Sequence, residues 1–395
     1  MQRCRSGTSA GNASNLRLGA RSDRSSAGLV NGLKVALITP YYQPVVGGIT
    51  TFVDGLRREL SARGADVRVW ARYGDDDRGV EIGPVHPILF SAKARRGIRT
   101  WRADVVHAHA HWYALLAGLT PYGTVAASTV FTIHTDVADR GRWFRDRVMS
   151  RMFGRVDAVT VLSQQSFDRF RARFPQVHRV EIVRPGIRLL SVTSAEVDQV
   201  SREHGLATAH PRLCVVSQMA WPAKVGGLEV LLRAMPRVLG AYPAAKLIVV
   251  GDGTGRRSLE ALASDLGLHS AVVFVGERQN PAPYLEASDL LLHCSFQETF
   301  GQSMLEGLSV GRPMIANQGA VRNLGVAPNE VGLVPVPGDP KSFADAIITL
   351  CKDAELRKDL GRRARHAASE WNWDAAFQTL ARLYRFPELG GTRRE

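Results

Sequence analysis

Apolar residues occur along the chain in two patterns: short continuous runs, and longer stretches in which they recur every three or four positions. The run LKVALITP, which begins at Leu33, predicts a buried strand, and the stretch from Ile49 to Arg63 predicts a helix with one apolar face. Gly64 ends that helix, and the run ADVRVWA predicts the next strand. A strand, a helix and a strand in this order begin a parallel sheet. The apolar face of the helix consists of Phe52, Val53, Leu56 and Leu60.

This alternation of strands and helices occurs twice. It stops where Pro185 and Gly186 precede a polar stretch from Leu190 to His210, and it starts again with the buried run RLCVV. A chain of 395 residues is long enough for two domains. We therefore predict an α/β protein with an N-terminal domain at residues 33–187 and a C-terminal domain at residues 188–371.

The two ends of the chain, residues 1–32 and 387–395, are predicted to be tails. The first contains five arginines, many small residues and no apolar run, which is typical of a disordered segment. An organelle-targeting peptide has a similar composition, but amphipathic periodicity is missing here. A start codon assigned too early is a further alternative.

Basic residues outnumber acidic ones by 51 to 37, and the formal net charge is +14. This charge favours an anionic partner such as a nucleotide, a phospholipid surface or a nucleic acid. The sequence shows no helix-turn-helix, zinc-finger or RNA-binding motif, so we expect no nucleic acid. No apolar run approaches the roughly 20 residues of a membrane span. Four scattered cysteines, three of them in apolar surroundings, are typical of reduced thiols in the cytoplasm. The oligomeric state stays open.

A segment with two glutamates follows the buried run from Leu290 to Cys294. Glu298 lies in a predicted loop, and Glu306 lies about one turn inside the next predicted helix, at ~3.6 residues per turn. The first backbone N–H groups of a helix are free and carry partial positive charge, so they bind anions such as phosphate. Carboxylates beside such a phosphate site suit a nucleotide sugar, whose hydroxyls donate to them. An ordinary βα turn with solvated glutamates is the alternative.

Two further strand ends carry residues that suit a ligand. Gly47 and Gly48 follow the first strand and let the backbone approach a phosphate or sugar closely, unless they only shape the turn. His134 ends the buried run VFTIH, and open α/β sheets bind ligands at the carboxyl ends of their strands. A structural histidine, bonded to a backbone carbonyl, is the alternative.

Three histidines, His107, His109 and His111, stand at every second position, so we expect them on one face of a strand end. They suit a polar lining of a ligand crevice, core packing or a zinc site, but no fourth zinc ligand is visible. The acidic run from Asp75 to Asp77 sits in a polar loop without partner ligands, which favours a solvated turn. We therefore predict no metal site.

A helical pattern at residues 140–156 combines an apolar stripe with a basic one. It is typical of a core-packed helix with a solvated face, and it also suits a surface that docks on anionic lipid or an acidic acceptor. The segment from Lys93 to Arg102 offers a second basic patch. The apolar stripe consists of Phe144, Val148, Met152 and Val156, and the basic stripe of Arg147, Arg151 and Arg155.

The spacing of Glu298 and Glu306, with Phe300 and Gly301 behind the first, resembles the signature of the retaining GT-B glycosyltransferases of family four, the glycosyl transferases group 1. The resemblance covers all but the tails. It implies two Rossmann-like domains facing across a cleft, the N-terminal one for the acceptor and the C-terminal one for the nucleotide sugar. It also implies that a last helix, at residues 372–386, returns to the N-terminal domain, and that no metal or other cofactor is required.

The resemblance also implies roles for single residues. His134 and Glu298 would act at the reacting sugar, and Glu306 would hold the ribose. Family members carry an arginine where this chain has Gln218, which donates hydrogen bonds without charge, and charge-assisted bonds are roughly twice as strong as neutral ones. The implied donor-binding residues are Gly47, Gly48, Gln218, Lys224, Gly253, Arg278, Phe300, Gly301, Gln302, Ser303 and Glu306.

The function implied by the resemblance is a retaining hexosyltransferase. It would move a sugar from a nucleotide-diphosphate sugar, with UDP favoured, to a hydroxyl of a small molecule, a secondary metabolite or an envelope glycan or lipid, as in high-GC bacteria. The expected location is the cytoplasm, with peripheral membrane contact through residues 140–156 as an option. One alternative is a non-catalytic nucleotide-sugar-binding protein or inactive subunit, which Gln218 favours. A nucleotide-sugar epimerase is disfavoured by the Phe-Gly pair.

Overall fold

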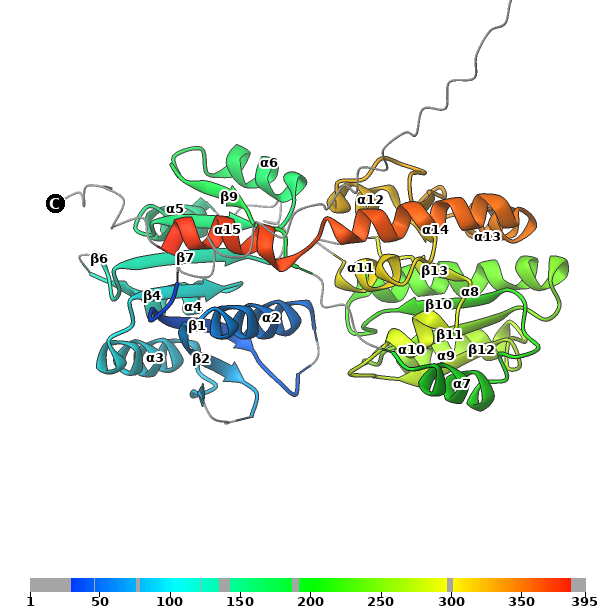
Figure 1. Ribbon diagram of the computed structural model, residues 1–395, viewed down its shortest axis with the longest axis horizontal. Coiled ribbons are helices and arrows are strands. Elements are labelled where there is room, and N and C mark those ends of the chain that lie inside the picture. The colour runs from blue at the N-terminus through cyan, green and yellow to red at the C-terminus, as the bar shows by residue number, and fades with distance from the viewer. Residues whose placement is uncertain are drawn as a thin grey trace, which may run out of the picture.

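The computed structural model describes residues 30–45, 47–75, 79–121, 123–134, 143–186, 192–296 and 301–384, without the side chains of residues 143–145. In this part of the chain, two large parallel sheets stand side by side with helices packed on both faces of each (Figure 1). The predicted α/β architecture of two Rossmann-like units is therefore confirmed. The predicted boundary between residues 187 and 188 lies outside the described residues.

The N-terminal sheet has the strand order β3-β2-β1-β4-β7-β8-β9. Helices α2 and α15 pack on one face of this sheet, and α3, α4 and α6 pack on the other. Its strands are β1 (Lys34–Tyr41), β2 (Asp66–Tyr73), β3 (Val80–Ile82), β4 (Val105–His109), β7 (Ser128–Ile133), β8 (Ala158–Val161) and β9 (Val180–Ile182), and a small hairpin consists of β5 (Leu119–Thr120) and β6 (Gly123–Thr124). Its helices are α2 (Gly48–Ala62), α3 (Pro87–Trp101), α4 (Trp112–Gly118), α5 (Trp143–Phe153) and α6 (Gln164–Arg173).

The beginning of this domain follows the predicted pattern closely. Strand β1 is buried from Val35 to Pro40, because helices cover both sides of the sheet. Helix α2 buries the four apolar residues of its predicted face, so its packing onto β1 and β2 removes a continuous apolar stripe from water.

The C-terminal sheet has the strand order β12-β11-β10-β13-β14-β15. Helices α8, α9 and α13 pack on one face, whereas α7, α10, α11 and α14 contribute to the core on the other. Its strands are β10 (Arg212–Val216), β11 (Lys246–Val250), β12 (Val272–Gly276), β13 (Leu290–His293), β14 (Met314–Ala316) and β15 (Gly332–Leu333). Its helices are α7 (Ser194–Glu203), α8 (Pro222–Ala241), α9 (Arg256–Asp265), α10 (Ala282–Glu286), α11 (Gln302–Ser309), α12 (Gln318–Leu324), α13 (Pro340–Lys352) and α14 (Ala354–Ser369).

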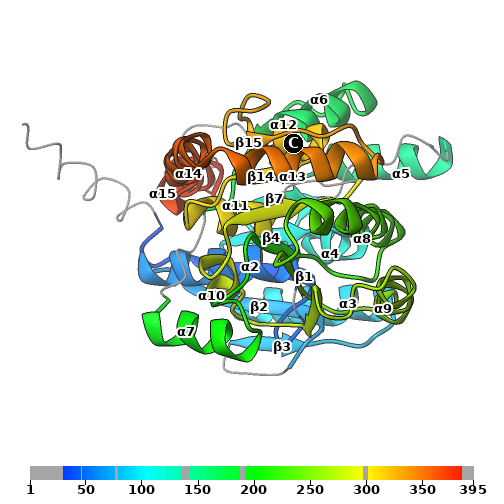
Figure 2. The same cartoon turned by 90° about the vertical axis from the view of Figure 1, so that its right-hand side faces the viewer.

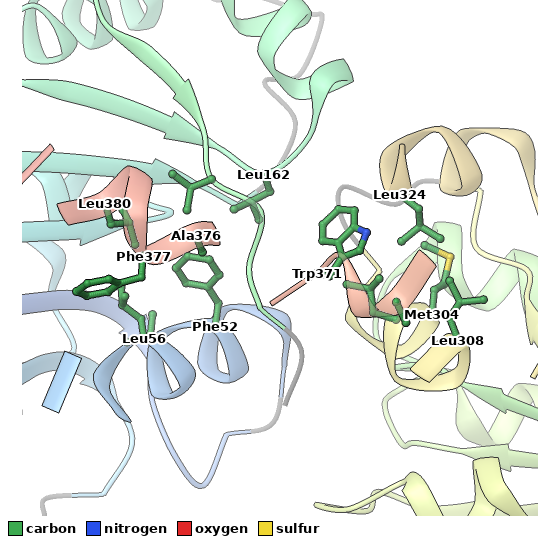
Figure 3. Close-up of a cluster of buried hydrophobic side chains, with 14 of the residues drawn as sticks. Phe52, Leu56, Leu162, Met304, Leu308, Leu324, Trp371, Ala376, Phe377 and Leu380 are labelled. Atoms are coloured by element: carbon green, nitrogen blue, oxygen red, sulfur yellow. The ribbon is translucent and has the colours of Figure 1, made fainter. Parts of the chain in front are cut away.

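The last helix, α15 (Trp373–Tyr384), crosses back to the N-terminal domain. In Figure 1, α14 and α15 run one after the other from the C-terminal to the N-terminal unit, and Figure 2 shows them nearly end-on. Trp371 lies against α11 and α12, whereas Phe377 lies against Phe52 and Leu56 of α2 (Figure 3). The predicted return of the C-terminal helix is therefore confirmed, and one apolar cluster joins both domains.

Two local predictions differ from the structure. Val30 is fully buried although it belongs to the predicted tail of residues 1–32, because the chain enters the core before β1 begins. On α5, Val148 is 40% exposed instead of packed, whereas Phe153 is buried.

Candidate functional site

The carboxyl end of β13 leads to α11, the helix expected to bind the donor phosphates. Gly301 precedes the helix with a φ of 76°, a left-handed conformation that glycine adopts without strain. The N–H groups of Gln302 and Ser303 therefore start the helix, and Glu306 lies one turn inside it, as predicted. The other two predicted residues of this segment, Glu298 and Phe300, lie outside the described residues.

Glu306 is half-buried, and its burial raises the pKa of its carboxyl to about 7, although a hydrogen bond with Gln302 opposes the shift. A carboxylate with this pKa changes charge near neutral pH. Two hydroxyls of a ribose would donate to the ionised form and favour it. The site therefore supplies a carboxylate that a ligand with adjacent hydroxyls stabilises.

Two residues that sequence reasoning missed hold the segment between β13 and α11. Asn317 Nδ2 donates hydrogen bonds of 3.0 Å to the carbonyl oxygens of both Cys294 and Ser295. A Cβ on Gly227 would lie 2.1 Å from the Cys294 oxygen, so only glycine allows α8 to approach the end of β13. The adjacent Gly226 and Gly227 indicate that the backbone approaches another segment closely, but local sequence pattern does not identify that segment.

The loop after β10 carries Gln218 and leads to Lys224, which stands in the first turn of α8. Gly253, predicted to contact the nucleotide, has a φ of 150°, and a Cβ there would lie 2.4 Å from the Met219 carbonyl carbon. The Met219 N–H donates to the backbone carbonyl oxygen of Asp252 at 2.8 Å. Gly253 thus joins two loops of the C-terminal domain, a structural role that the prediction did not include.

Arg278 follows β12 and is held beside α10. Its Nε donates to the Tyr284 hydroxyl at 2.9 Å, and its Nη1 donates to the backbone carbonyl oxygen of Glu277 at 3.0 Å. The guanidinium also lies over the Tyr284 ring. Arg278 is therefore fixed on the carboxyl side of β12, the side on which α/β sheets bind ligands.

The two domains meet at the glycine loop after β1. A Cβ on Gly47 would lie 3.4 Å from Gln218 Nε2, whereas a Cβ on Gly48 would meet nothing within 4 Å. The carboxyl ends of β1 and β10 therefore face each other, and the structure brings Gly47, Gly48 and Gln218 together. We call this meeting of the two carboxyl edges the crevice.

On the N-terminal edge of the crevice, His134 follows β7 and is 7% exposed. Its Nε2 lies 3.2 Å from Nδ1 of His109, and its ring lies edge-on to Phe52, with ring centroids 5.0 Å apart. Burial, together with the charge of His111, lowers the pKa of His134 to about 3. The imidazole is therefore neutral at pH 7 and offers hydrogen bonds to a ligand instead of a positive charge.

The neighbouring histidines are part of the core. His107 and His109 are fully buried, with His107 Nδ1 2.7 Å from the Tyr384 hydroxyl and His107 Nε2 2.6 Å from Thr132 Oγ1. Burial lowers the pKa of His107 to about 3 and holds that of His109 well below its usual value. The predicted crevice lining is wrong for His107, because α15 covers it.

His111 does not share the face of the other two histidines. Ala110 has a φ of 66°, which breaks the strand alternation, and His111 is exposed at the start of α4. Among the described residues, no three histidine, cysteine or acidic side chains are grouped as metal ligands.

The chain also matches known protein families and relatives. Residues 46–189 match the family described as Glycosyltransferase Family 4, and residues 210–353 match the one described as Glycosyl transferases group 1. The D-inositol 3-phosphate glycosyltransferase of Acidothermus cellulolyticus is 26% identical over 89% of this chain and 90% of its own. The N-acetyl-alpha-D-glucosaminyl L-malate synthase of Bacillus anthracis is 30% identical over 44% of this chain and 45% of its own.

The fold is also similar to that of solved structures. The crystal structure of Anabaena HepE in complex with UDP superimposes with a TM-score of 0.74 at 20% identity, covering 88% of this chain and 98% of that one. At this identity the likeness concerns the fold alone. It includes both sheets, because nearly the whole of the other chain is matched.

Proposed function

Because the chain belongs to the group 1 and family 4 glycosyltransferases, we propose that it transfers a hexosyl group from a nucleotide-diphosphate sugar to a hydroxyl, with retention of the anomeric configuration. The observation that carries the proposal is the start of α11 beside Glu306, on the edge of the crevice opposite His134. An anion-binding helix end and a carboxylate of raised pKa suit a diphosphate joined to a ribose.

The donor binds to the C-terminal edge. Lys224 and the N–H groups of Gln302 and Ser303 stabilise the diphosphate, which gains charge as the sugar leaves. Gln218 adds an uncharged donor, and Glu306 accepts from the ribose. We favour UDP as the nucleotide and expect no metal ion, so that chelation by EDTA leaves the activity unchanged.

The chemical step breaks the bond between the anomeric carbon and the diphosphate oxygen and forms a bond from that carbon to the acceptor oxygen. The proton of the acceptor hydroxyl passes to the departing diphosphate. His134, neutral and held by His109, orients the sugar, and Glu298 assists it. A neutral imidazole with such a low pKa is too weak a base to take the acceptor proton itself.

The acceptor is proposed to be a small polyol that carries an anionic group. The names of the two relatives refer to D-inositol 3-phosphate and L-malate, and both compounds combine a hydroxyl with phosphate or carboxylate. The net charge of +14 favours the same class. Secondary metabolites and envelope lipids of this chemistry belong to the same proposal.

Peripheral membrane contact from the cytoplasm is proposed through α5. Arg147 and Arg151 are exposed on this helix, Arg155 is exposed just after it, and Val148 is 40% exposed. Basic and apolar side chains on one helix attract anionic lipid surfaces. No helix in the described ranges is long and apolar enough to cross a membrane. Binding to phosphatidylglycerol vesicles that is lost when the three arginines are changed to glutamine supports this contact, and unchanged binding contradicts it.

The test of the proposed activity is to incubate the full chain with UDP-glucose and UDP-N-acetylglucosamine, with and without inositol phosphate or malate. Release of UDP and an α-configured product, read by proton NMR, supports a retaining transferase. A β-configured product contradicts retention. UDP binding without any release of UDP favours the alternative of a nucleotide-sugar-binding protein, for which the uncharged Gln218 is the specific observation.

A further inference from the structure

A pair of stacked tyrosines stands at the carboxyl ends of β1 and β2. Tyr41 and Tyr73 are opposite each other in the parallel register, and their ring centroids lie 5.7 Å apart with an interplanar angle of 18°. Both are half-buried, and in the part of the chain that the structure describes neither hydroxyl has a hydrogen-bond partner. Two phenol groups therefore remain available on the N-terminal edge of the crevice.

Arg72 lies beside this pair and is held on several sides. Its guanidinium carbon is 4.9 Å from the Tyr73 ring centroid and 5.1 Å from that of Tyr113, and its Nε donates to the Val85 carbonyl oxygen. Burial raises the pKa of Tyr113, and a hydrogen bond with Arg72 opposes that shift. These contacts fix the plane of the guanidinium before any ligand arrives.

Within the described ranges, the charge of Arg72 has no counter-ion. Among residues 30–45, 47–75, 79–121 and the later described ranges, no carboxylate forms an ion pair with Arg72, and Asp75, three positions on, is exposed. A guanidinium that is ordered by two rings yet unpaired is a preorganised site for a carboxylate or phosphate, which it binds with two parallel hydrogen bonds.

The position of Arg72 fits the acceptor side of the reaction. Strands β2, β1, β4 and β7 are neighbours in this order, so three spacings of ~4.8 Å place β2 roughly 14 Å from the strand that ends before His134. This span leaves room for the transferred sugar and an acceptor of one ring. His111, stacked on Tyr113 with centroids 5.2 Å apart, lies between the two.

We propose that Arg72, together with the hydroxyls of Tyr41 and Tyr73, binds the anionic group of the acceptor, a phosphate or a carboxylate. The proposal rests on the proposed transferase function and names the residues that select its substrate class. The arginine donates two N–H groups to the anion, and the phenols donate to its remaining oxygens.

The anionic group has two chemical sources, a free phosphate ester or carboxylate and the phosphodiester of a lipid headgroup. Val85, Ile88 and Leu89, with exposed fractions of 60%, 56% and 58%, lie next to the Arg72 contact and would accept the apolar part of a lipid. Both sources use the same guanidinium, so one set of variants tests them together.

The experiment compares the full chain with Arg72→Gln and Arg72→Lys in the presence of UDP. The matched control is Arg68→Gln, since Arg68 stands on the same strand but stacks on Trp101, with 4.9 Å between its guanidinium and the ring centroid. Circular dichroism and the melting temperature check that the variants fold. One arm measures binding of inorganic phosphate and L-malate by NMR titration, and the other measures binding to phosphatidylglycerol vesicles.

We expect Arg72→Gln to lower the affinity for the soluble anions, for the vesicles or for both by about tenfold or more. The affinity of Arg72→Lys should fall between, because lysine keeps the positive charge but cannot form the two parallel hydrogen bonds of a guanidinium. If only the binding of soluble anions is lost, the acceptor group is a free phosphate ester or carboxylate. If only the binding to vesicles is lost, it is the phosphodiester of a lipid headgroup. Unchanged binding in both arms, or an equal loss in Arg68→Gln, overturns the proposal.

The affinity for UDP and the slow hydrolysis of UDP-sugar separate this inference from the proposed function. The proposed function places UDP on the C-terminal edge, so we expect the affinity for UDP to be unchanged in Arg72→Gln. If the unaltered chain neither binds UDP nor hydrolyses the donor, the transferase function fails first. If it does both while Arg72→Gln behaves like the unaltered chain toward every anion, the assignment of Arg72 alone is wrong.

Discussion

The two edges of the crevice are built from the same kind of parallel sheet and yet differ in charge. On the N-terminal edge, His134 is neutral, and it is backed by the buried, neutral His107 and His109. On the C-terminal edge, Glu306 changes charge near neutral pH, and Lys224 and the start of α11 supply positive charge. This difference supports the proposal that the first edge fixes the shape of the reacting centre, whereas the second stabilises the charge of a bound diphosphate.

The origin of this difference is the C-terminal helix. The Tyr384 hydroxyl lies beside His107, and Ser128 Oγ donates to the Leu383 carbonyl oxygen at 3.0 Å, so α15 buries the histidine row of the N-terminal sheet. The C-terminal edge has loops in the corresponding place, held by glycines and Asn317. The returning helix therefore does more than join the domains: it keeps the imidazoles out of water and neutral.

The largest expected effect is on the rate of sugar transfer and concerns His134 of the N-terminal edge. His134→Ala should lower the rate of sugar transfer by about a hundredfold or more, because it removes a preorganised hydrogen bond at the reacting sugar. The affinity for UDP should stay unchanged, since the nucleotide binds to the other edge. Single-turnover kinetics and calorimetry measure the two quantities, and a loss of UDP affinity as large as the loss of rate would contradict the separation of roles.

The next effect concerns the charge at Gln218 on the C-terminal edge and its influence on the affinity for UDP. Gln218→Arg should raise the affinity for UDP by about tenfold, because a charge-assisted bond to the diphosphate replaces a neutral one. UDP calorimetry at two salt concentrations measures the gain, which salt should reduce. Gln218→Glu provides the opposite charge and should weaken binding, so a similar affinity in both variants would place Gln218 away from the diphosphate.

The hydrogen bond between His109 and His134 fixes one tautomer. His109 Nε2 is buried and has no partner among the described residues, so a proton there would be an unsatisfied donor. The proton therefore belongs on His109 Nδ1, which donates to His134 Nε2. His134 then carries its own proton on Nδ1 and faces the ligand as a donor.

This arrangement predicts different outcomes for two variants of similar polarity. His109→Asn, whose amide nitrogen takes the place of Nδ1, should keep the transfer rate within about threefold, whereas His109→Gln and His109→Ala should lower it about tenfold. Nitrogen-15 NMR should show the His134 proton on Nδ1 in the unaltered chain and in the Asn variant. A proton on Nε2 of His134 would contradict the assignment.

The smallest effect concerns stability. Tyr384→Phe removes the hydroxyl that contacts His107 and leaves a buried polar atom without a partner, which should cost about 1–3 kcal/mol of unfolding free energy. UDP affinity should not change. Urea unfolding followed by tryptophan fluorescence measures the loss, and Tyr384→Leu should cost more because it also removes packing. Full stability in the Phe variant would mean that His107 finds another partner.

Local pattern predicts much of the fold and of the C-terminal edge. The buried strands, the apolar face of α2 and the position of Glu306 one turn into α11 all follow from the spacing of residues close in sequence. The N-terminal edge was predicted less well. The alternation of histidines predicted one shared face, but the left-handed Ala110 turns His111 away, and Tyr384, distant in sequence, covers His107.

Packing partners that are distant in sequence account for the remaining differences. Gly253 was expected to contact the donor, whereas the structure shows it against Met219. Gly227, for which the sequence predicted no role, lies against Cys294. Asn317 carried no signal in the sequence, although it bonds to two carbonyls at the end of β13. Such contacts depend on how strands are ordered in the sheet, which local pattern does not specify.

The most direct test of the account is a titration of UDP against the full chain and Glu306→Gln between pH 5.5 and 8.5, as far as about 1.5 units on either side of neutral. Ribose hydroxyls require the ionised carboxylate, so affinity should fall by up to about tenfold per unit as the pH drops below the Glu306 pKa of about 7, and should level off above it. Glu306→Gln should bind more weakly and without this dependence. Equal affinity and equal pH dependence in both proteins would contradict the assignment of the donor nucleotide to α11 and Glu306.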